Sequence, residues 1–246
     1  MTLEDFFAAH PRTALGFSGG VDSSYLLWAA KKAGAEIRPY FVKSPFQPEF
    51  ELQDALKLGK LLDISITVLE LEIPQPVLDN PKERCYHCKK VIFGTLRNQA
   101  ETDGFRELLD GSNASDDPSE RPGMRALGEM HILSPLRICG LTKGEIRERS
   151  RQAGLFTWDK PAYACLATRF PTGTIITKEK LAQVEAAEGL LFDLGLTDFR
   201  VRVFHGAARI QVPHTQMERL LEHRETILDT LKQSFSGVML DLEGRP

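Results

Sequence analysis

The sequence predicts an α/β fold, a doubly wound parallel sheet with helices on both faces, followed by a smaller α+β domain. Through the first two-thirds of the 246 residues, apolar strand-like segments alternate with helical segments, and this repeated β-α-β order is typical of a parallel sheet. A glycine-rich turn joins the first strand to the first long helix. From about residue 161 the order changes to helix, two adjacent strands, helix and strand. We therefore predict domains at 1–160 and 161–246.

The elements of the first domain follow from apolar periodicity and from turn residues. Thr13–Phe17 is predicted as a strand, and the apolar run from Tyr25 as a helix that ends near Gly34. Thr142 and Glu145 form a capping box that opens a helix to about residue 153. The other expected elements are strands at 36–42, 64–69 and 105–109, helices ending near 62 and spanning 88–100, and a short strand or extended segment at 132–136.

The second domain is expected to hold a helix at 178–194, strands at 199–204 and 208–212, a helix at 215–233 and a strand at 237–242. Glu188 falls on the apolar stripe of the first helix, where a carboxylate is costly unless it is paired or metal-bound. Alternation along the next strand puts Arg200 and Arg202 on one face, with Arg209 on the neighbouring strand. Such a row of arginines fits a phosphate or a carboxylate, and a solvated outer face is the alternative.

Composition excludes several classes of protein. The formal net charge of −3 and the pI of about 6.1 provide no basic field for bulk nucleic acid, so no nucleic-acid partner is expected. No segment has the charge pattern of a signal peptide or the apolar length of a membrane span, so no membrane partner is expected either. Four cysteines in an intracellular chain of this size indicate metal binding or catalysis rather than disulfides, and we expect a cytoplasmic protein.

The turn after the first strand has the residues of a phosphate-binding loop. Its glycines let the backbone approach an anion, and N–H groups at the start of the following helix point at phosphate oxygens. A carboxylate beside phosphates repels them unless a divalent cation lies between, so Asp22 is predicted to bind Mg²⁺. Gly111, after the strand at 105–109, is expected at the same edge of the sheet. The loop consists of Ser18, Gly19, Gly20, Val21, Asp22, Ser23 and Ser24.

Two cysteine sites carry further chemistry. Cys85 and Cys88 form a CxxC pair near an expected helix start, where nearby basic residues favour thiolates. The pair could grip one metal, yet a structural zinc site needs four ligands and no second CxxC is present; two buried small hydrophobes are the alternative. Cys165 lies in a loop with Pro and Gly residues between the two domains, where Lys160 and Arg169 favour its thiolate.

The SGGVDSS run at 18–24 resembles the PP-loop of ATP pyrophosphatases, which release pyrophosphate and lack the Gly-Lys-Ser/Thr of kinase-type loops. Further stretches follow in the order NPKERCYHCKK, DGSNASDD, RPGMRAL, SPLRICGLTKGEIR, WDKPAYACLATRFPTGT, QVEAAEGLL and FRVRVFHGAARIQVP. This order resembles the LarE family, ATP-dependent sulfur transferases that make the nickel-pincer nucleotide cofactor of lactate racemase. The resemblance covers nearly the whole chain, and it implies an adenine-nucleotide hydrolase-like first domain.

The resemblance implies a reaction on pyridinium-3,5-biscarboxylic acid mononucleotide. ATP adenylates a carboxylate, pyrophosphate leaves, and a sulfur nucleophile displaces AMP to give a thiocarboxylate. In relatives with only the cysteine that matches Cys165, this residue gives up its sulfur and becomes dehydroalanine. Other relatives have three cysteines, thought to hold a [4Fe-4S] cluster; Cys85, Cys88 and Cys165 match that pattern, and we expect the cluster route here.

The same resemblance assigns roles to further residues. Glu188 matches an acidic residue near the reactive sulfur, and we count it with Cys165 as catalytic. Arg200 and Arg202 match binders of a substrate or AMP phosphate, Tyr86 stands where a ring stacks on the pyridinium, and Arg169 joins the substrate site. Asn113, Asp116 and Asp117 match the loop beside the nucleotide, without an assigned role.

Other functions stay open. A PP-loop tRNA thiolase would need a basic surface and an RNA-binding appendage, and an ammonia-using synthetase would give Cys165 no task. A nucleotide-binding regulator with a structural metal would bind ATP without releasing pyrophosphate. A homo-oligomer is also open. The family's usual Gly-Tyr-Arg-x-Gly-Ser tail does not follow Leu242 in this chain, so reduced activity is one expectation.

Overall fold

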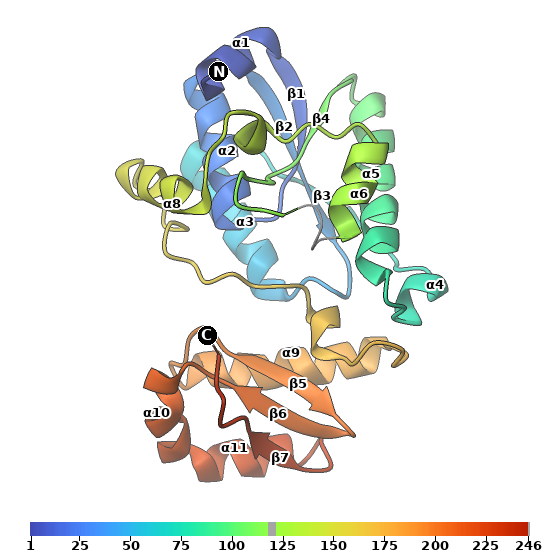
Figure 1. The fold of residues 1–246 in the computed structure, drawn as a ribbon, viewed down its shortest axis with the longest axis vertical. Helices are drawn as coiled ribbons and strands as arrows, with labels where there is room; N and C mark the ends of the chain where they lie inside the picture. Colours follow the sequence, from blue (N-terminus) through green and yellow to red (C-terminus); the bar gives the residue numbers. More distant parts are fainter. Residues whose placement is uncertain (118–121, 246) are drawn as a thin grey trace. The chain divides into compact units, whose positions relative to one another are not determined.

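The structure is a computed structural model that describes residues 1–117 and 122–245 (Figure 1). The chain divides into two compact units, of which the first holds Met1–Val77 and Glu83–Lys160 and the second holds Leu78–Lys82 and Pro161–Pro246. The backbone therefore passes between the units three times. Arg121, the first residue of the RPGMRAL stretch, lies outside the described residues.

A four-stranded sheet in the order β3-β2-β1-β4 organises the first unit. β1 (Arg12–Gly16) pairs with β2 (Glu36–Lys43) and with β4 (Leu108–Leu109), and β2 also pairs with β3 (Thr67–Glu70). All three pairings are parallel, so the predicted parallel α/β sheet is confirmed. The helices along this part of the chain are α1 (Leu3–Ala9), α2 (Val21–Lys32), α3 (Glu49–Leu62), α4 (Gln75–Leu78), α5 (Arg84–Thr102), α6 (Pro122–Glu129), α7 (Pro135–Ile138) and α8 (Lys143–Gln152).

Each face of this sheet has its own apolar core, because successive residues of a strand point to opposite faces. Leu15 of β1 packs in a cluster with Leu26 of α2 and Leu58 of α3. Its neighbour Ala14 packs in a second cluster with Phe93 and Leu96 of α5. Figure 1 shows the corresponding helices on either side of the strands. Burial of each such leucine contributes about 1.5–3 kcal/mol, so the two cores hold the doubly wound arrangement together.

Two predicted strands begin later than expected, because their first residues close the preceding helix. Ile64 N donates to Gly59 O at the end of α3, and Phe105 N donates to Ala100 O at the end of α5. β3 and β4 start only after these bonds. Because Phe105 closes α5 in this way, β4 does not begin there and is only two residues long.

The segment predicted as a strand at 132–136 makes a single parallel bridge, between Leu133 and Leu109. Helix α7 follows from Pro135, which fits the first position of a helix because its missing N–H has no acceptor there. Helix α5 begins at Arg84 rather than near residue 88, so the CxxC pair lies inside the helix. The short helices α1, α4 and α6 were not predicted.

The second unit holds a three-stranded sheet in the order β5-β6-β7. β5 (Arg200–Phe204) and β6 (Ala207–Gln211) are antiparallel, whereas β7 (Val238–Leu240) lies parallel to β6. The helix predicted at 215–233 breaks at His223, which ends one helix and caps the next. The helices are α9 (Lys178–Asp193), α10 (Met217–Glu222) and α11 (Arg224–Leu231).

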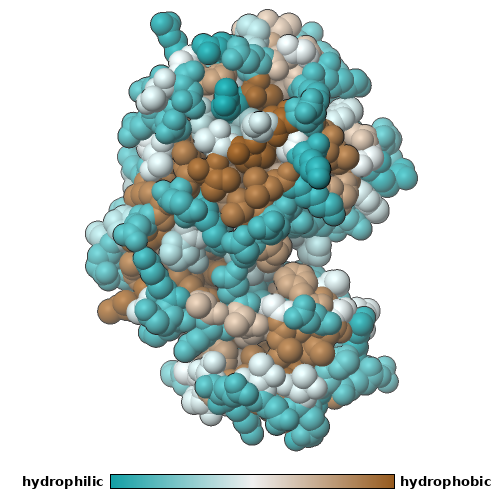
Figure 2. Space-filling view, turned by 180° about the vertical axis from the view of Figure 1, so that it is seen from behind, coloured by the Kyte–Doolittle hydropathy of each residue, from teal (hydrophilic) through white to brown (hydrophobic). Residues whose placement is uncertain are grey.

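On the face shown in Figure 2, the surface of the first unit is mostly hydrophilic around one apolar patch. Among the described residues, no helix combines the length and the apolarity needed to cross a bilayer. Figure 2 shows apolar residues gathered on one face of the first unit, with hydrophilic residues around them. Pairing of identical chains stays a prediction.

Candidate functional site

The turn between β1 and α2 has the shape of an anion-binding loop. Gly19 has a φ of +70°, and a Cβ at this position would lie 3.2 Å from Glu51 O and 3.3 Å from Ala55 Cβ on α3. The left-handed backbone and the close approach of α3 therefore both require glycine. Gly20 is the extended N-cap residue of α2 and makes no side-chain cap, so the helix end is not closed by a side chain.

Backbone donors and hydroxyls line this helix end. Ser24 N donates to Gly20 O at 3.0 Å, and the earlier N–H groups of the first turn point out of the helix. The hydroxyls of Ser18 and Ser23 share a hydrogen bond at 3.1 Å, and Ser18 N donates to Ser23 Oγ at 3.3 Å. Ser24 is fully buried, and its Oγ has no hydrogen-bond partner among the described residues. The loop is thus pre-formed by its own serines.

The loop after β4 packs against the same helix end. A Cβ on Gly111 would lie 3.1 Å from Ser23 N and 3.3 Å from Ser23 Cα, so any larger residue would crowd the start of α2. Beyond it, Asn113 is buried, its Oδ1 accepts from Ser115 N at 2.8 Å, and its N donates to Asp116 Oδ2 at 2.9 Å. The structure therefore brings the glycine loop and Gly111 together at one edge of the sheet.

Asp22 forms an ion pair that the sequence did not reveal. Lys143, the first residue of α8, donates from Nζ to Asp22 Oδ2 at 2.6 Å. The sequence indicated only the capping box around this residue, which the structure confirms between Thr142 and Glu145. Asp22 Oδ1 is buried and has no hydrogen-bond partner in the part of the chain that the structure describes. An unsatisfied carboxylate oxygen at this position fits the predicted Mg²⁺ ligand.

Cys85 and Cys88 occupy the start of α5, three residues apart, and therefore share one face of the helix. Cys85 is exposed, Cys88 is partly exposed, and none of the four cysteines forms a disulfide. The guanidinium of Arg84 donates to Cys85 Sγ at 3.7 Å. The exposure of Cys85 does not fit the alternative of a buried small hydrophobe.

The ring of Tyr86, on the same helix, contacts cations. The Arg125 guanidinium lies 4.1 Å and Lys90 Nζ lies 5.2 Å from the ring centroid. Tyr86 Oη donates to Glu129 Oε2 at 2.7 Å, and Arg125 pairs with Glu83 at 3.0 Å. The ring thus already contacts two cations of the protein, and stacking on a pyridinium stays a prediction.

The third predicted cluster cysteine belongs to the second unit. Cys165 precedes the single turn of 3₁₀ helix at Leu166–Arg169, and its carbonyl accepts from Thr168 N at 3.0 Å and from Thr168 Oγ1 at 2.9 Å. Within residues 1–117 and 122–245, no group of three or more His, Cys, Asp and Glu side chains is arranged to hold a metal ion. The iron-sulfur site therefore stays a prediction.

A buried ion pair holds the Cys165 loop in the second unit. Arg169 Nε and Nη2 donate to the two oxygens of Glu188 at 2.7 Å and 3.0 Å, and the side chains are only 0% and 2% exposed. Arg169 Nη1 also donates to Ala164 O at 3.0 Å. Burial lowers the pKa of Arg169, but the hydrogen bonds and charge of Glu188 outweigh it and raise the pKa. The carboxylate on the apolar stripe of α9 is therefore paired, as its position required.

The other acceptor sites of Glu188 are also filled. Val201 N donates to Oε1 at 2.8 Å, and Tyr163 Oη donates to Oε2. The Tyr163 ring centroid lies 4.6 Å from the Arg169 guanidinium and 5.0 Å from that of Arg200. Sequence reasoning missed Tyr163, because a loop residue has no periodicity that marks its partners. Glu188 thus holds Arg169 and Tyr163 in place, and its catalytic role stays a prediction.

Arg200 and Arg202 hold the same loop by its backbone. Arg200 Nη2 donates to Ala162 O, and Arg202 Nη1 donates to Thr168 O at 2.8 Å. Arg202 Nε also donates to Gln211 Oε1 at 2.6 Å. Alternation along β5 predicted that both arginines share a face, but not that both bind carbonyls of the Cys165 loop.

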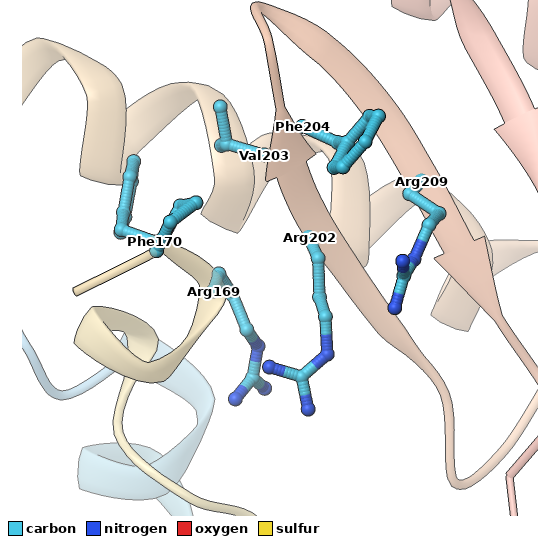
Figure 3. A pocket seen from close by; sticks show the side chains of 7 residues that line it. Arg169, Phe170, Arg202, Val203, Phe204 and Arg209 are labelled. Atoms are coloured by element: carbon cyan, nitrogen blue, oxygen red, sulfur yellow. The ribbon is translucent and has the colours of Figure 1, made fainter. Parts of the chain in front are cut away.

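A cavity of about 170 Å³ lies beside these arginines (Figure 3). In Figure 3 the guanidinium groups of Arg169 and Arg202 lie side by side, with Arg209 next to them. Arg209 pairs with Asp241 at 3.3 Å, while Arg209 Nε is buried without a hydrogen-bond partner among the described residues. Burial, and then the charges of Arg169 and Arg209, lower the pKa of Arg202. An anion in the cavity would relieve this repulsion. The lining consists of Arg169, Phe170, Pro171, Arg202, Val203, Phe204 and Arg209.

Known proteins were compared with the chain. No family model matches it. The chain is 36% identical over 250 residues to the uncharacterized protein slr1717 of Synechocystis, covering 98% of this chain and 92% of that protein. It is 24% identical over 189 residues to the tRNA-specific 2-thiouridylase MnmA of Thermotoga maritima, covering 58% of this chain and 52% of that protein.

A characterised relative is similar over almost the full length. The chain is 30% identical over 238 residues to the pyridinium-3,5-bisthiocarboxylic acid mononucleotide synthase of Lactiplantibacillus plantarum, covering 95% of this chain and 86% of that protein. The likeness to the thiouridylase covers a smaller part of both chains and identifies a distant relative. The glycine loop, the Cys165 loop and their arginines all lie in the region shared with the synthase, and the chain belongs to the family of that enzyme, the LarE family.

Proposed function

We propose that this protein is an ATP-dependent sulfur transferase of nickel-pincer nucleotide synthesis. It converts a carboxylate of pyridinium-3,5-biscarboxylic acid mononucleotide to a thiocarboxylate, with release of AMP and pyrophosphate. The observation that carries the proposal is the 30% identity to the pyridinium-3,5-bisthiocarboxylic acid mononucleotide synthase over 95% of this chain.

The glycine loop is proposed to bind ATP. The N–H groups at the start of α2 and the hydroxyls of Ser18 and Ser23 would hold phosphate oxygens, and Gly19 and Gly111 let the two loops pack closely against α3 and α2. Asp22 would hold Mg²⁺, which offsets the charge of the polyphosphate. A substrate carboxylate oxygen attacks the α-phosphorus, the bond from that phosphorus to the pyrophosphate oxygen breaks, and an acyl adenylate forms.

Cys165 is proposed as the residue that reaches the acyl adenylate. Its loop is held in place by hydrogen bonds from Arg200, Arg169 and Arg202 to the carbonyls of Ala162, Ala164 and Thr168, respectively. In the sacrificial route the thiolate would attack the acyl carbon and AMP would leave. The Cα proton of Cys165 and its Cβ–S bond would then be lost, which gives the thiocarboxylate and dehydroalanine.

The preferred route uses a [4Fe-4S] cluster on Cys85, Cys88 and Cys165. The CxxC pair fits cysteine ligands of iron, because Cys85 and Cys88 lie three residues apart on one face of α5 and are exposed and partly exposed. Three protein ligands would leave one iron position for the sulfide that is transferred. In this route Cys165 serves as a ligand and keeps its sulfur.

Each unit is proposed to offer side chains that fit one part of the substrate. The arginine-lined cavity beside Arg202 and Arg209 has the charge to take its phosphate or a carboxylate, and the cation-binding ring of Tyr86 fits the pyridinium. Arg169 and Arg200 support this site through the loop they hold, because their donors are committed to Glu188 and to loop carbonyls.

The proposal is tested by pyrophosphate release. Protein purified without oxygen is mixed with ATP, Mg²⁺ and the biscarboxylate nucleotide, and we expect pyrophosphate only when all three are present. C165S should still release pyrophosphate but form no thiocarboxylate, whereas D22N should release it at least about 10-fold more slowly. Release without the pyridinium nucleotide, or thiocarboxylate from C165S, would contradict the assignment.

A further inference from the structure

The nucleotide loop contains no cationic side chain of its own. A bound triphosphate has about four negative charges, and backbone N–H groups with one divalent ion offset only part of them. Lys143 comes to this loop from α8, far along the chain, and its Nζ lies 2.6 Å from Asp22 Oδ2.

The backbone holds Lys143 at this place while its side chain stays able to move. Lys143 N donates to Ser115 Oγ at 3.1 Å, and Ala114 N donates to Leu141 O at 2.8 Å, which ties α8 to the loop after β4. Thr142 caps the helix immediately before it. The Lys143 side chain is 35% exposed, so a swing of its ammonium away from Asp22 does not disturb the core.

Asp22 is only half satisfied in this arrangement. Oδ2 has the lysine, whereas Oδ1 is buried and has no hydrogen-bond partner among the described residues. A buried carboxylate oxygen without a partner is costly, and a divalent cation would satisfy it. A cation at Asp22 would in turn repel the ammonium of Lys143.

We propose that Lys143 is the polyphosphate-binding lysine of this protein, and that its pair with Asp22 is the resting position it leaves when Mg²⁺ and ATP bind. The inference rests on the proposed use of ATP and adds a residue to that site. The ammonium exchanges one carboxylate oxygen for phosphate oxygens, which a compact lysine charge binds well. In this position it also stabilises pyrophosphate as the leaving group.

The variant K143M separates this role from a structural one, because two affinities should move in opposite directions. By titration calorimetry, the affinities for Mg·ATP and for Mg·pyrophosphate should each fall at least about 10-fold, while that for AMP changes less than about twofold. By electron paramagnetic resonance, the affinity of nucleotide-free protein for Mn²⁺ should rise several-fold, because Asp22 no longer has a competing cation.

Two further variants serve as controls. K32M removes the same charge from the opposite end of α2, where Lys32 lies over the Trp28 ring, and should leave all these affinities unchanged. K143R should keep most of the Mg·ATP affinity. Unchanged Mg·ATP binding in K143M, or a parallel fall in Mn²⁺ and Mg·ATP affinities, overturns the role of Lys143 and leaves ATP use intact. If the wild-type protein itself binds no Mg·ATP, the proposed function falls, and the inference with it.

Discussion

At the residue scale, buried charged side chains of the second unit hold the loop that contains Cys165. Glu188 could be predicted to need a partner from its place on an apolar stripe, since a lone carboxylate inside a protein is costly. That partner, Arg169, could not be predicted, because it comes from a loop without periodicity. Tyr163 was missed for the same reason.

Loss of the Glu188 charge should destabilise the protein strongly. E188Q leaves the fully buried Arg169 without its counter-charge, which costs about 3–5 kcal/mol of unfolding free energy, measured by urea denaturation. The matched control E148Q breaks an exposed pair with Arg151, and should leave the free energy of unfolding nearly unchanged. Equal losses in the two variants would mean that the buried pair does not hold the loop.

Tyr40 on β2 gives a prediction for pH. Burial, and then the hydrogen bond to Asp103 at 2.7 Å, raise the pKa of its hydroxyl. An acid whose folded pKa is raised stabilises the fold fully below its unfolded pKa, about 10 for tyrosine, and loses this contribution as the pH rises further. We therefore expect wild-type stability to fall more steeply above about pH 10 than that of Y40F, by urea denaturation at several pH values. Parallel curves would contradict this role for Tyr40.

At the element scale, the strand-turn-helix unit around the glycine loop could be predicted from the sequence, because glycines, serines and flanking apolar runs all agree. The parallel sheet and the capping box of α8 were readable too. The segment at 132–136 was not, since a short apolar run gives no period, and Pro135 starts a helix there. The Lys143 pair was hidden because α8 meets α2 only in the folded chain.

The close packing of Gly111 against Ser23 should affect the affinity for ATP. In G111A the new Cβ would meet backbone atoms of Ser23 at 3.1 Å and 3.3 Å, which displaces the start of α2. We expect at least about 10-fold weaker ATP binding by calorimetry, with a loss of stability of about 1–3 kcal/mol. G128A, where no atom lies within 4 Å of the new Cβ, is the control and should bind ATP normally. Normal binding by G111A would show that this loop does not shape the nucleotide site.

At the scale of the whole molecule, the predicted site residues are distributed over the two units. The glycine loop and the CxxC pair belong to the first unit, and Cys165 with its arginines belongs to the second. The sequence did not predict that Leu78–Lys82 joins the second unit, where Asn80 O accepts from Gly173 N at 2.8 Å, because such bonds link residues far apart in the chain. The backbone passes from one unit to the other between Lys82 and Glu83, shortly before Cys85 and Cys88. It passes again between Lys160 and Pro161, shortly before Cys165.

Sulfur transfer to a pyridinium carboxylate is the proposed reaction of this protein. The most direct test follows the masses of product and intact protein together, in an oxygen-free reaction with ATP, Mg²⁺ and the biscarboxylate nucleotide. We predict a product in which one carboxylate oxygen is replaced by sulfur, with the protein mass unchanged if Cys85, Cys88 and Cys165 hold a cluster. A protein that loses the mass of H₂S would instead identify Cys165 as the donor. No sulfur in the nucleotide, despite pyrophosphate release, would contradict the account.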